Sequence, residues 1–325
     1  MTNEMLENIL RRYDLDRPVP TFLRHNENRT YRVQDRSGNK YLLRVHDPFV
    51  PGMAGLQHRF DGIVAELDML EHWGRWNERE VQVPVRNREG GLVTTFEENG
   101  RKIHASLLTW LEGRDLVKND LPYEDTIRKL GEQLANLHAF FGRYEPVGLE
   151  ARPHQGRAYN DKMAGVIRSG AEKGLFAAGD ADTIEETLRL VNDRLTGTGS
   201  EGPGLIHGDI GLANTILTES GEVRFIDFGF YGRGYALTDT AMGVMMLPAD
   251  WRRRFLEVYS GGKSWTEADL RKIDGFMLVA IIGYYVFQFG NAKMHDWMRE
   301  RMPMLCREYC LPFLAGEPML ERIGF

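Results

Sequence analysis

The sequence predicts an α+β fold in two parts: a small amino-terminal part, mostly antiparallel sheet with one helix, and a larger, mainly helical carboxyl-terminal part. Alternating residues in TYRV and YLLRV, joined by a Ser-Gly-Asn turn, predict a β-hairpin over residues 28–46. Apolar residues at helical spacing, from Ile63 to Trp73, predict a helix over residues 60–76. Helical patterns dominate the chain from residue 123 onward.

The remaining elements follow from the same patterns. A short amphipathic helix is expected at the start of the chain, and a polar, hairpin-like segment separates two further strands, at residues 81–85 and 105–110. The expected helices of the second part cover residues 123–142, 157–172, 180–195 and the apolar stretch 276–287. The pattern changes near Gly113, which gives a first lobe of residues 1–112 and a second of residues 113–325.

Composition limits the possible functions. The 325 residues are 42% hydrophobic and 27% charged, as in ordinary soluble globular proteins. A formal net charge of −6 lacks the basic footprint of a nucleic-acid-binding protein. The longest apolar stretch is shorter than the roughly 20 residues of a membrane span, and no signal peptide is evident. We therefore expect a cytoplasmic protein without nucleic-acid or membrane partners, and reduced thiols at Cys306 and Cys310.

A glycine-rich segment matches the residue spacing of a dinucleotide-binding fingerprint but not its structural context. Gly197, Gly199 and Gly202 have the spacing GxGxxG. Such a loop follows a strand and opens a helix, whereas this one leads out of a predicted helix into a strand. We reject it as a phosphate-binding loop.

The stretch LIHGDIGLANTIL carries three polar residues among apolar neighbours: His207, Asp209 and Asn214, spaced HxDxxxxN. Asp227-Phe228-Gly229 follows, after the strand-like VRFI. This order is typical of a phosphoryl-transfer site, with a catalytic-loop Asp, an Asn ligand and a DFG Asp on magnesium. We expect LIH and VRFI to be neighbouring strands that bring these residues together. The alternative is that the polar residues only cap a turn and bond locally.

The chain resembles the aminoglycoside phosphotransferase and choline kinase family, which includes homoserine kinases and has the protein-kinase-like two-lobe fold. The resemblance rests on HGDIGLANTIL followed by FIDFG, with ENRTYRV, YLLRVH, LANLH and TDTA elsewhere. It implies that Asp209 is the catalytic base and that Asn214 and Asp227 bind Mg²⁺, which bridges the phosphates of ATP. It also implies that Asp239 braces the catalytic loop, and His207 is expected to brace the backbone rather than react.

In the first lobe, the resemblance implies a nucleotide site. Asn28 lies on the loop over the nucleotide, Glu66 pairs with the basic residue of the third strand, and backbone groups near Thr109 to Leu111 contact adenine. The basic residue is Arg44, where lysine is usual, and HNENRTY replaces the glycine-rich loop. Arginine keeps a permanent charge and offers a fork for phosphate. The alternative for Arg44 is an exposed strand arginine that pairs with a surface acid.

The acceptor is expected to be a small molecule. Only residues 230–238 separate DFG from Asp239 and no APE follows, whereas protein kinases place a long activation segment there. Four polar residues at helical spacing predict one stripe of a helix facing the acceptor, or else facing solvent: Tyr284, Gln288, Asn291 and His295.

The resulting hypothesis is an ATP- and Mg²⁺-dependent phosphotransferase acting on a hydroxyl of an aminoglycoside, an amino alcohol or a homoserine-like compound, as a monomer or homodimer. Two alternatives remain open at this point. One is a serine/threonine protein kinase of the same fold, and the other is a nucleotide-binding protein that has lost catalysis. The intact Asp209, Asn214 and Asp227 argue against the second alternative, because a protein that only binds nucleotide has no need of a base.

Overall fold

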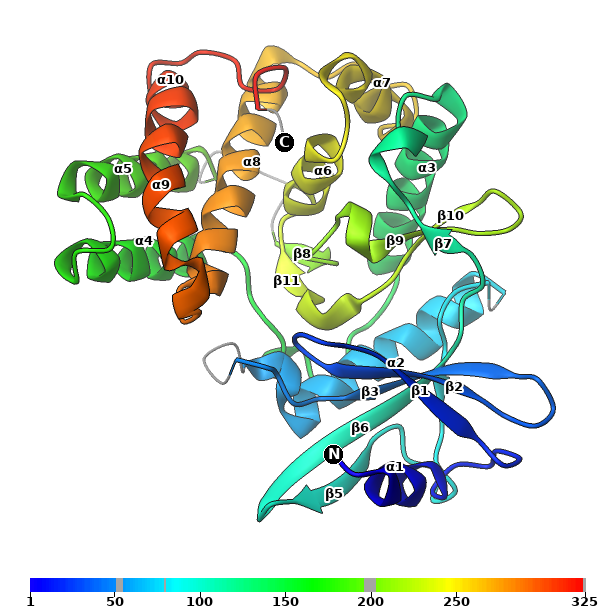
Figure 1. The fold of residues 1–325 in the computed structure, drawn as a ribbon. Helices are drawn as coiled ribbons and strands as arrows, with labels where there is room; N and C mark the ends of the chain where they lie inside the picture. Colours follow the sequence, from blue (N-terminus) through cyan, green and yellow to red (C-terminus); the bar gives the residue numbers. More distant parts are fainter. Residues whose placement is uncertain (51–54, 79, 196–202, 324–325) are drawn as a thin grey trace. The chain divides into compact units, whose positions relative to one another are not determined.

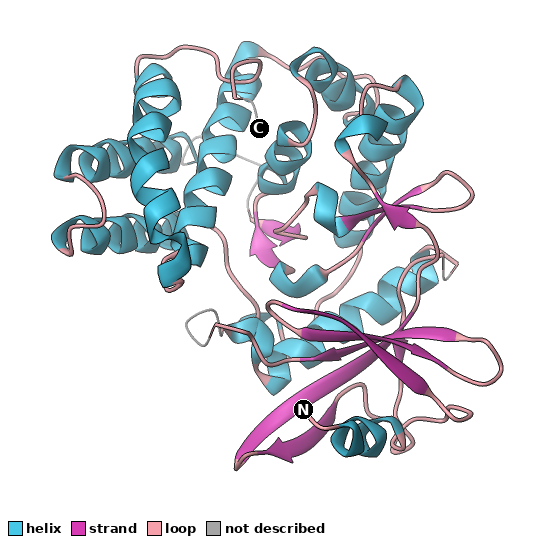
Figure 2. Ribbon diagram, in the orientation of Figure 1, coloured by secondary structure: helices cyan, strands magenta, loops and turns pink. Residues whose placement is uncertain are grey.

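A computed structural model of the chain describes residues 1–50, 55–78, 80–195 and 203–323. The glycines of the GxGxxG segment lie outside the described residues. The chain divides into two compact units, one of Met1–Gly113 with Tyr144–Pro153 and one of Arg114–Arg143 with His154–Phe325. The predicted mixture of an antiparallel sheet and a mainly helical carboxyl-terminal part is confirmed (Figure 2).

Unit 1 contains an antiparallel sheet in the order β1-β2-β3-β6-β4, with β5 paired to β6 (Figure 1). Its strands are β1 (Val19–His25), β2 (Arg29–Gln34), β3 (Lys40–Val45), β4 (Pro84–Val85), β5 (Thr94–Glu98) and β6 (Arg101–Thr109). The predicted hairpin of residues 28–46 is confirmed as β2–β3. The sequence did not reveal β1, because both of its faces are largely exposed and its residues lack an apolar alternation.

The described part of unit 1 contains the α-helices α1 (Asn3–Leu10) and α2 (Phe60–Trp76), both as predicted. Successive strand residues point to opposite faces of the sheet. Leu43 and Val45 of β3 are therefore buried in one cluster with Leu6 of α1. Arg44 points to the opposite face, where it meets Glu66 of α2. Because alternate residues of β3 face opposite sides of the sheet, Arg44 points toward α2.

The segment Tyr144–Pro153, which includes the short helix η4 (Leu149–Ala151), belongs to unit 1 although it follows a helix of unit 2. It contacts α2 at two places. The Tyr144 hydroxyl donates to Asp68 Oδ2 at 2.7 Å, and Arg152 Nη1 donates to the Gly62 carbonyl at 3.0 Å. This segment therefore fixes the face of α2 that carries Glu66.

Unit 2 is mainly helical. Its α-helices are α3 (Glu124–Phe141), α4 (Arg157–Glu172), α5 (Ala178–Leu195), α6 (Ala236–Met245), α7 (Ala249–Tyr259), α8 (Glu267–Gln288), α9 (His295–Leu305) and α10 (Leu311–Leu314). The helices predicted at residues 123–142, 157–172 and 180–195 are confirmed. Helices α4 and α5 lie side by side (Figure 1). The predicted buried helix is the carboxyl-terminal part of α8, where Met277 and Ile282 are inaccessible to solvent.

The short strands of unit 2 pair differently from the prediction. They are β7 (Arg114–Asp115), β8 (Gly204–Ile206), β9 (Thr215–Leu217), β10 (Val223–Phe225) and β11 (Gly232–Gly234). The LIH strand β8 pairs with β11, and the VRFI strand β10 pairs with β9, so these two strands are not neighbours. The tight turn closed by the Thr218 N–H and the Glu222 carbonyl (2.8 Å) pairs the two strands that flank it directly.

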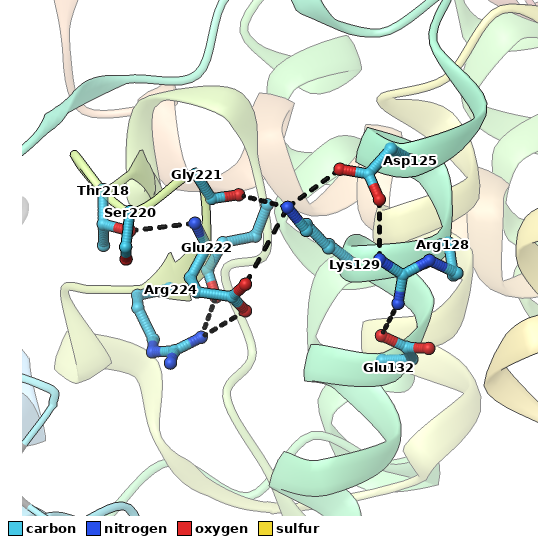
Figure 3. A network of polar contacts seen from close by, with 10 residues as sticks. Asp125, Arg128, Lys129, Glu132, Thr218, Ser220, Gly221, Glu222 and Arg224 are labelled. Atoms are coloured by element: carbon cyan, nitrogen blue, oxygen red, sulfur yellow. Dashed lines mark hydrogen bonds and ion pairs between the residues drawn. The ribbon is translucent and has the colours of Figure 1, made fainter.

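Helix α3 anchors the β9–β10 turn (Figure 3). Lys129 Nζ donates to the Gly221 carbonyl at 2.8 Å and forms an ion pair with Asp125 Oδ2 at 2.8 Å. The same ammonium lies 3.8 Å from Glu222 Oε1. Because β9 begins directly after Asn214, this anchor holds one end of the segment that carries Asp209 and Asn214.

In the described part of the chain, no helix combines the length with the apolar content that a membrane span requires. Cys306 and Cys310 are both free and buried.

Candidate active site

The loop that follows β8 is held by a buried carboxylate. Asp239, in the first turn of α6, accepts from the backbone N–H of His207 through Oδ2 and from that of Gly208 through Oδ1, both at 2.8 Å. The His138 ring of α3 lies 3.1 Å from the same Oδ2. Asp239 is inaccessible to solvent, so its charge is stabilised by these donors rather than by water. The geometry is that of a rigid brace on the loop.

His207 is buried beneath the loop and bonded at both ring nitrogens. Nδ1 accepts from the Asp209 N–H at 3.2 Å, which leaves the proton on Nε2 to be donated to the Ile226 carbonyl at 3.1 Å. The Phe228 ring packs on the imidazole with centroids 4.3 Å apart. His207 thus ties the segment before Asp209 to the segment before Asp227, a link that strand pairing does not provide.

The glycine between His207 and Asp209 is required by its conformation and its surroundings. Gly208 has φ +79°, and a Cβ there would lie 2.7 Å from the Phe230 carbonyl oxygen. Both conditions disfavour any other residue.

We expect Gly208→Ala to displace the loop and to lower turnover by about 100-fold, because a displacement of about 1 Å has that effect on catalysis. The control is Gly38→Ala, at φ +89° with no atom within 4 Å of the added Cβ. Gly38→Ala should lower the unfolding free energy by about 1–2 kcal/mol, which is the cost of placing a residue with a Cβ in left-handed backbone. Chemical unfolding and steady-state kinetics measure both variants, and equal effects would contradict a steric requirement at Gly208.

Asp209 and Asn214 are in direct contact. Asn214 Nδ2 donates to Asp209 Oδ2 at 2.7 Å and to the Asp209 carbonyl at 2.9 Å. Burial raises the pKa of Asp209 above its usual value, and the neighbouring Asp227 carboxylate raises it further. A carboxylate with a raised pKa beside a second carboxylate is common at catalytic sites.

Asp227 occupies left-handed backbone, φ 62° and ψ 69°, a region that aspartate tolerates better than most residues. Phe228 is buried against His207, which fixes the start of the short helix η6 (Phe228–Phe230). Asp227 is close enough to Asp209 to raise its pKa. The structure therefore brings together Asp209, Asn214 and Asp227, as the motifs predicted.

The donor set of these residues fits a hard divalent cation. Both amide hydrogens of Asn214 are directed at Asp209, which leaves Oδ1 for another partner, and Asp227 offers a carboxylate. Within the described ranges, no three His, Cys, Asp or Glu side chains cluster as a metal site. Magnesium binds through one or two protein oxygens together with waters and phosphate oxygens, so this limited donor set suits it.

In unit 1, Arg44 and Glu66 form a buried ion pair, with Nη1 2.7 Å from Oε1. Arg44 is not the exposed strand arginine of the alternative interpretation. Its Nε lies 3.4 Å from Ser106 Oγ, which also bonds His46 Nε2 at 2.9 Å. Burial, and next the Arg44 charge, hold the pKa of His46 well below its usual value.

The other predicted nucleotide contacts lie at strand ends of unit 1. Asn28 precedes β2, and its Oδ1 is buried without a hydrogen-bond partner in the described part of the chain. At the end of β6, the Thr109 N–H donates to the Val83 carbonyl at 2.8 Å and the Trp110 N–H to the Lys40 carbonyl at 3.1 Å. The Leu111 N–H donates to no backbone carbonyl among the described residues.

The four polar residues expected on one helical stripe do not share a helix. Tyr284 and Gln288 lie on α8, Asn291 caps the short helix η7 (Ala292–Met294), and His295 begins α9. A turn brings part of the set together instead, because Asn291 Nδ2 donates to Gln288 Oε1 at 3.1 Å. The prediction of one stripe was wrong because Gly290 disfavours helix and Asn291 caps the next one, and periodicity does not register either effect.

The sequence did not predict two residues that contact the candidate site. His138 of LANLH bonds Asp239, and its other nitrogen lies 2.8 Å from the Tyr259 hydroxyl. Arg152 reaches Glu66, with Nη1 3.9 Å from Oε2. The LANLH motif was a usable signal for His138, whereas nothing in ARPH indicated that Arg152 is buried.

Solved structures of several kinases are similar to the chain. A microcompartment-associated aminopropanol kinase matches with TM-score 0.73 and 19% identity, over 99% of each chain. An amicoumacin kinase in complex with AMP-PNP and Ca²⁺ matches with TM-score 0.70 and 16% identity, over 98% of this chain and 95% of its own. A spectinomycin phosphotransferase in complex with ADP and spectinomycin matches with TM-score 0.67 and 13% identity, over 99% of each. At these identities the similarity concerns the fold.

No curated protein matches the chain significantly. The model of the phosphotransferase enzyme family matches residues 20–276, which is more than half of the 325 residues. This match includes both the loop of Asp209 and the DFG segment, so the resemblance drawn from those motifs is confirmed. The chain belongs to the phosphotransferase enzyme family.

Proposed function

We propose that this phosphotransferase uses ATP and Mg²⁺ to phosphorylate a hydroxyl group of a small polar molecule. The observation that supports this most strongly is the loop braced by Asp239, which holds Asp209 against Asn214 and beside Asp227. Phosphoryl transfer needs a base for the incoming hydroxyl and oxygen ligands for the cation on the phosphates. These three residues offer that combination.

In the proposed mechanism, unit 2 carries the chemistry. Asp209 Oδ accepts the proton of the acceptor hydroxyl and orients its oxygen for in-line attack on the γ-phosphorus of ATP, as the bond from that phosphorus to the β–γ bridging oxygen breaks and ADP leaves. Asn214 Oδ1 and the Asp227 carboxylate would hold Mg²⁺, which would supply positive charge to the phosphate oxygens. Asp239 and His207 keep the loop rigid, so that Asp209 does not have to be reoriented during turnover.

Unit 1 is proposed to bind the nucleotide. Arg44, fixed by Glu66, supplies a permanent positive charge for phosphate oxygens. Asn28 lies on the turn proposed to cover the phosphates, and its buried Oδ1 has no described partner. The segment from Thr109 to Leu111 is proposed to bond adenine, with the Leu111 N–H as donor.

A small acceptor is favoured over a protein acceptor. Residues 230–238 are occupied by the end of η6, by β11 and by the start of α6, which leaves no room in the sequence for a long activation segment. The similar structures also favour a small acceptor, since they include kinases for aminopropanol, amicoumacin and spectinomycin. Amino alcohols, aminoglycosides and homoserine-like compounds are the proposed classes, with Tyr284, Gln288, Asn291 and His295 as candidate contacts.

The destination of the phosphoryl group tests this proposal. The protein is incubated with Mg²⁺ and γ-labelled ATP, with and without pools of amino alcohols, aminoglycosides and homoserine, and the label is followed into protein and small-molecule fractions. We expect acceptor-dependent label in the small-molecule fraction. Stoichiometric label on the protein chain would support a protein kinase instead, and ATP binding without transfer would support a nucleotide sensor.

The raised pKa of Asp209 predicts how activity depends on pH. The base acts as carboxylate, so activity is retained above the raised pKa and is lost as the pH falls through it. On the acidic side we expect kcat to fall about tenfold per pH unit, beginning at a higher pH than an ordinary aspartate would give. ADP binding, measured in parallel by calorimetry, separates loss of the base from loss of nucleotide. A kcat that stays level down to the ordinary range of aspartate would contradict this assignment.

A further inference from the structure

Glu66 of α2 faces two guanidinium groups. Its Oε1 is 2.7 Å from Arg44 Nη1, and its Oε2 is 3.9 Å from Arg152 Nη1. The three residues are 1%, 4% and 2% exposed, in the order Glu66, Arg44 and Arg152. A charge buried to this degree needs close partners of opposite charge.

Arg44 keeps an unused hydrogen-bond donor in this cluster. Burial lowers the pKa of both neighbouring histidines, His46 and His58, so that they stay neutral. Asp47, the other carboxylate near His58, is already bonded to Arg29. Arg44 Nη2 is buried and has no hydrogen-bond partner in the described ranges. The cluster therefore retains an unused donor on Arg44.

Arg152 is held against α2 independently of Glu66. The same Nη1 donates to the Gly62 carbonyl at 3.0 Å, in the first turn of α2. A Cβ on Gly62 would lie 2.9 Å from the Ala151 carbonyl oxygen, so the two backbones are in close contact here. Tyr144, at the other end of the segment, donates to Asp68. The Arg152 side chain is thus fixed on the side of Glu66 Oε2.

We propose that Arg152 is a positioning residue that keeps Glu66 from binding Arg44 through both oxygens. An arginine and a carboxylate prefer two parallel hydrogen bonds, which would occupy both terminal nitrogens of Arg44. Because Arg152 attracts Oε2, Glu66 engages Arg44 through Oε1 alone. Arg44 Nη2 is left for an anionic oxygen, which is a nucleotide phosphate; this identification rests on the proposed function.

The test compares ligands with and without phosphates. Arg152→Met keeps the length of the side chain and removes its charge, so it should weaken ADP binding by about tenfold or more, the worth of one charge-assisted hydrogen bond. Affinity for adenosine should stay within about twofold. A merely structural role would weaken both ligands alike. Arg152→Lys, which keeps the charge, should also weaken ADP binding more than adenosine binding, but by a smaller factor. This variant replaces Arg152→Met in the test if Arg152→Met does not fold.

The matched control is Tyr144→Phe, which removes another bond between the same segment and α2 without reaching Glu66. It should leave ADP affinity unchanged. The inference is overturned if Tyr144→Phe weakens ADP as much as Arg152→Met does, if ADP and adenosine weaken equally, or if ADP affinity is unaffected in both Arg152 variants.

Arg44→Met separates failure of this inference from failure of the proposed function. If Arg44→Met weakens ADP binding and the Arg152 variants do not, only the role of Arg152 is wrong. If the wild-type protein binds no ADP, or if Arg44→Met does not change ADP affinity, the proposed nucleotide site is wrong. The proposed role of Arg152 is then wrong as well. If both residues act through one phosphate contact, the double variant should bind ADP no more weakly than Arg44→Met alone.

Discussion

Replacing Asp209 by asparagine is expected to lower kcat by about 10²- to 10⁴-fold, the usual contribution of a general base. The substitution preserves shape and leaves an oxygen for the Asn214 Nδ2 bond, which is 2.7 Å in the native protein. It removes the group that accepts the hydroxyl proton. ADP affinity, measured by calorimetry, should stay within a fewfold of the native value because Asp209 is not proposed to hold the nucleotide.

Asp250→Asn is the matched control for this variant. Asp250 is an exposed aspartate in the first turn of α7, and no role in the site is proposed for it. Its kcat should equal the native value. An Asp209→Asn enzyme that retains native turnover would remove Asp209 from the mechanism, and a variant that lost ADP binding in proportion to turnover would assign it to nucleotide binding instead.

Asp239→Ala should have the largest effect on stability. The change leaves the buried N–H groups of His207 and Gly208 without their acceptor, and each unsatisfied group costs about 1–3 kcal/mol. We therefore expect the unfolding free energy to fall by about 2–6 kcal/mol. Turnover in the folded fraction should also fall, because the loop that presents Asp209 is no longer braced. Urea unfolding and kinetics at a temperature where the variant stays folded measure the two effects.

Thr240→Ala tests whether the effect belongs to the brace. Thr240 is the next residue of α6, is equally buried, and donates only to the Ala236 carbonyl within its own helix. Loss of this hydrogen bond should lower the unfolding free energy by about 0.5–1.5 kcal/mol and leave turnover unchanged. If Asp239→Ala and Thr240→Ala destabilise equally, the loop does not depend on Asp239.

The parts of the molecule that local sequence determines were predictable. The β2–β3 hairpin follows from alternating residues and a turn, and α2 to α5 follow from helical spacing. The group of Asp209, Asn214 and Asp227 followed from motif chemistry. In each case the signal lies within a few neighbouring residues, where periodicity and residue type are informative.

The features that depend on distant contacts were not predictable. Periodicity does not specify which strands pair, and β8 pairs with β11 while β10 pairs with β9, so the expected pairing of LIH with VRFI was wrong. The segment Tyr144–Pro153 belongs to unit 1 only because its side chains find partners on α2. Arg152 is a polar residue in a loop by sequence, and only the fold reveals that it is buried beside Glu66.

The most direct test of the central claim is acceptor-dependent formation of ADP from Mg²⁺ and ATP, measured side by side for the native protein and Asp209→Asn. The panel contains amino alcohols, homoserine, sugars and aminoglycosides. We predict that at least one compound stimulates ADP formation in the native protein and that the stimulation is lost in Asp209→Asn while ADP binding remains. Stimulation that persists in the variant, or ATP binding without stimulation by any compound, would contradict the account.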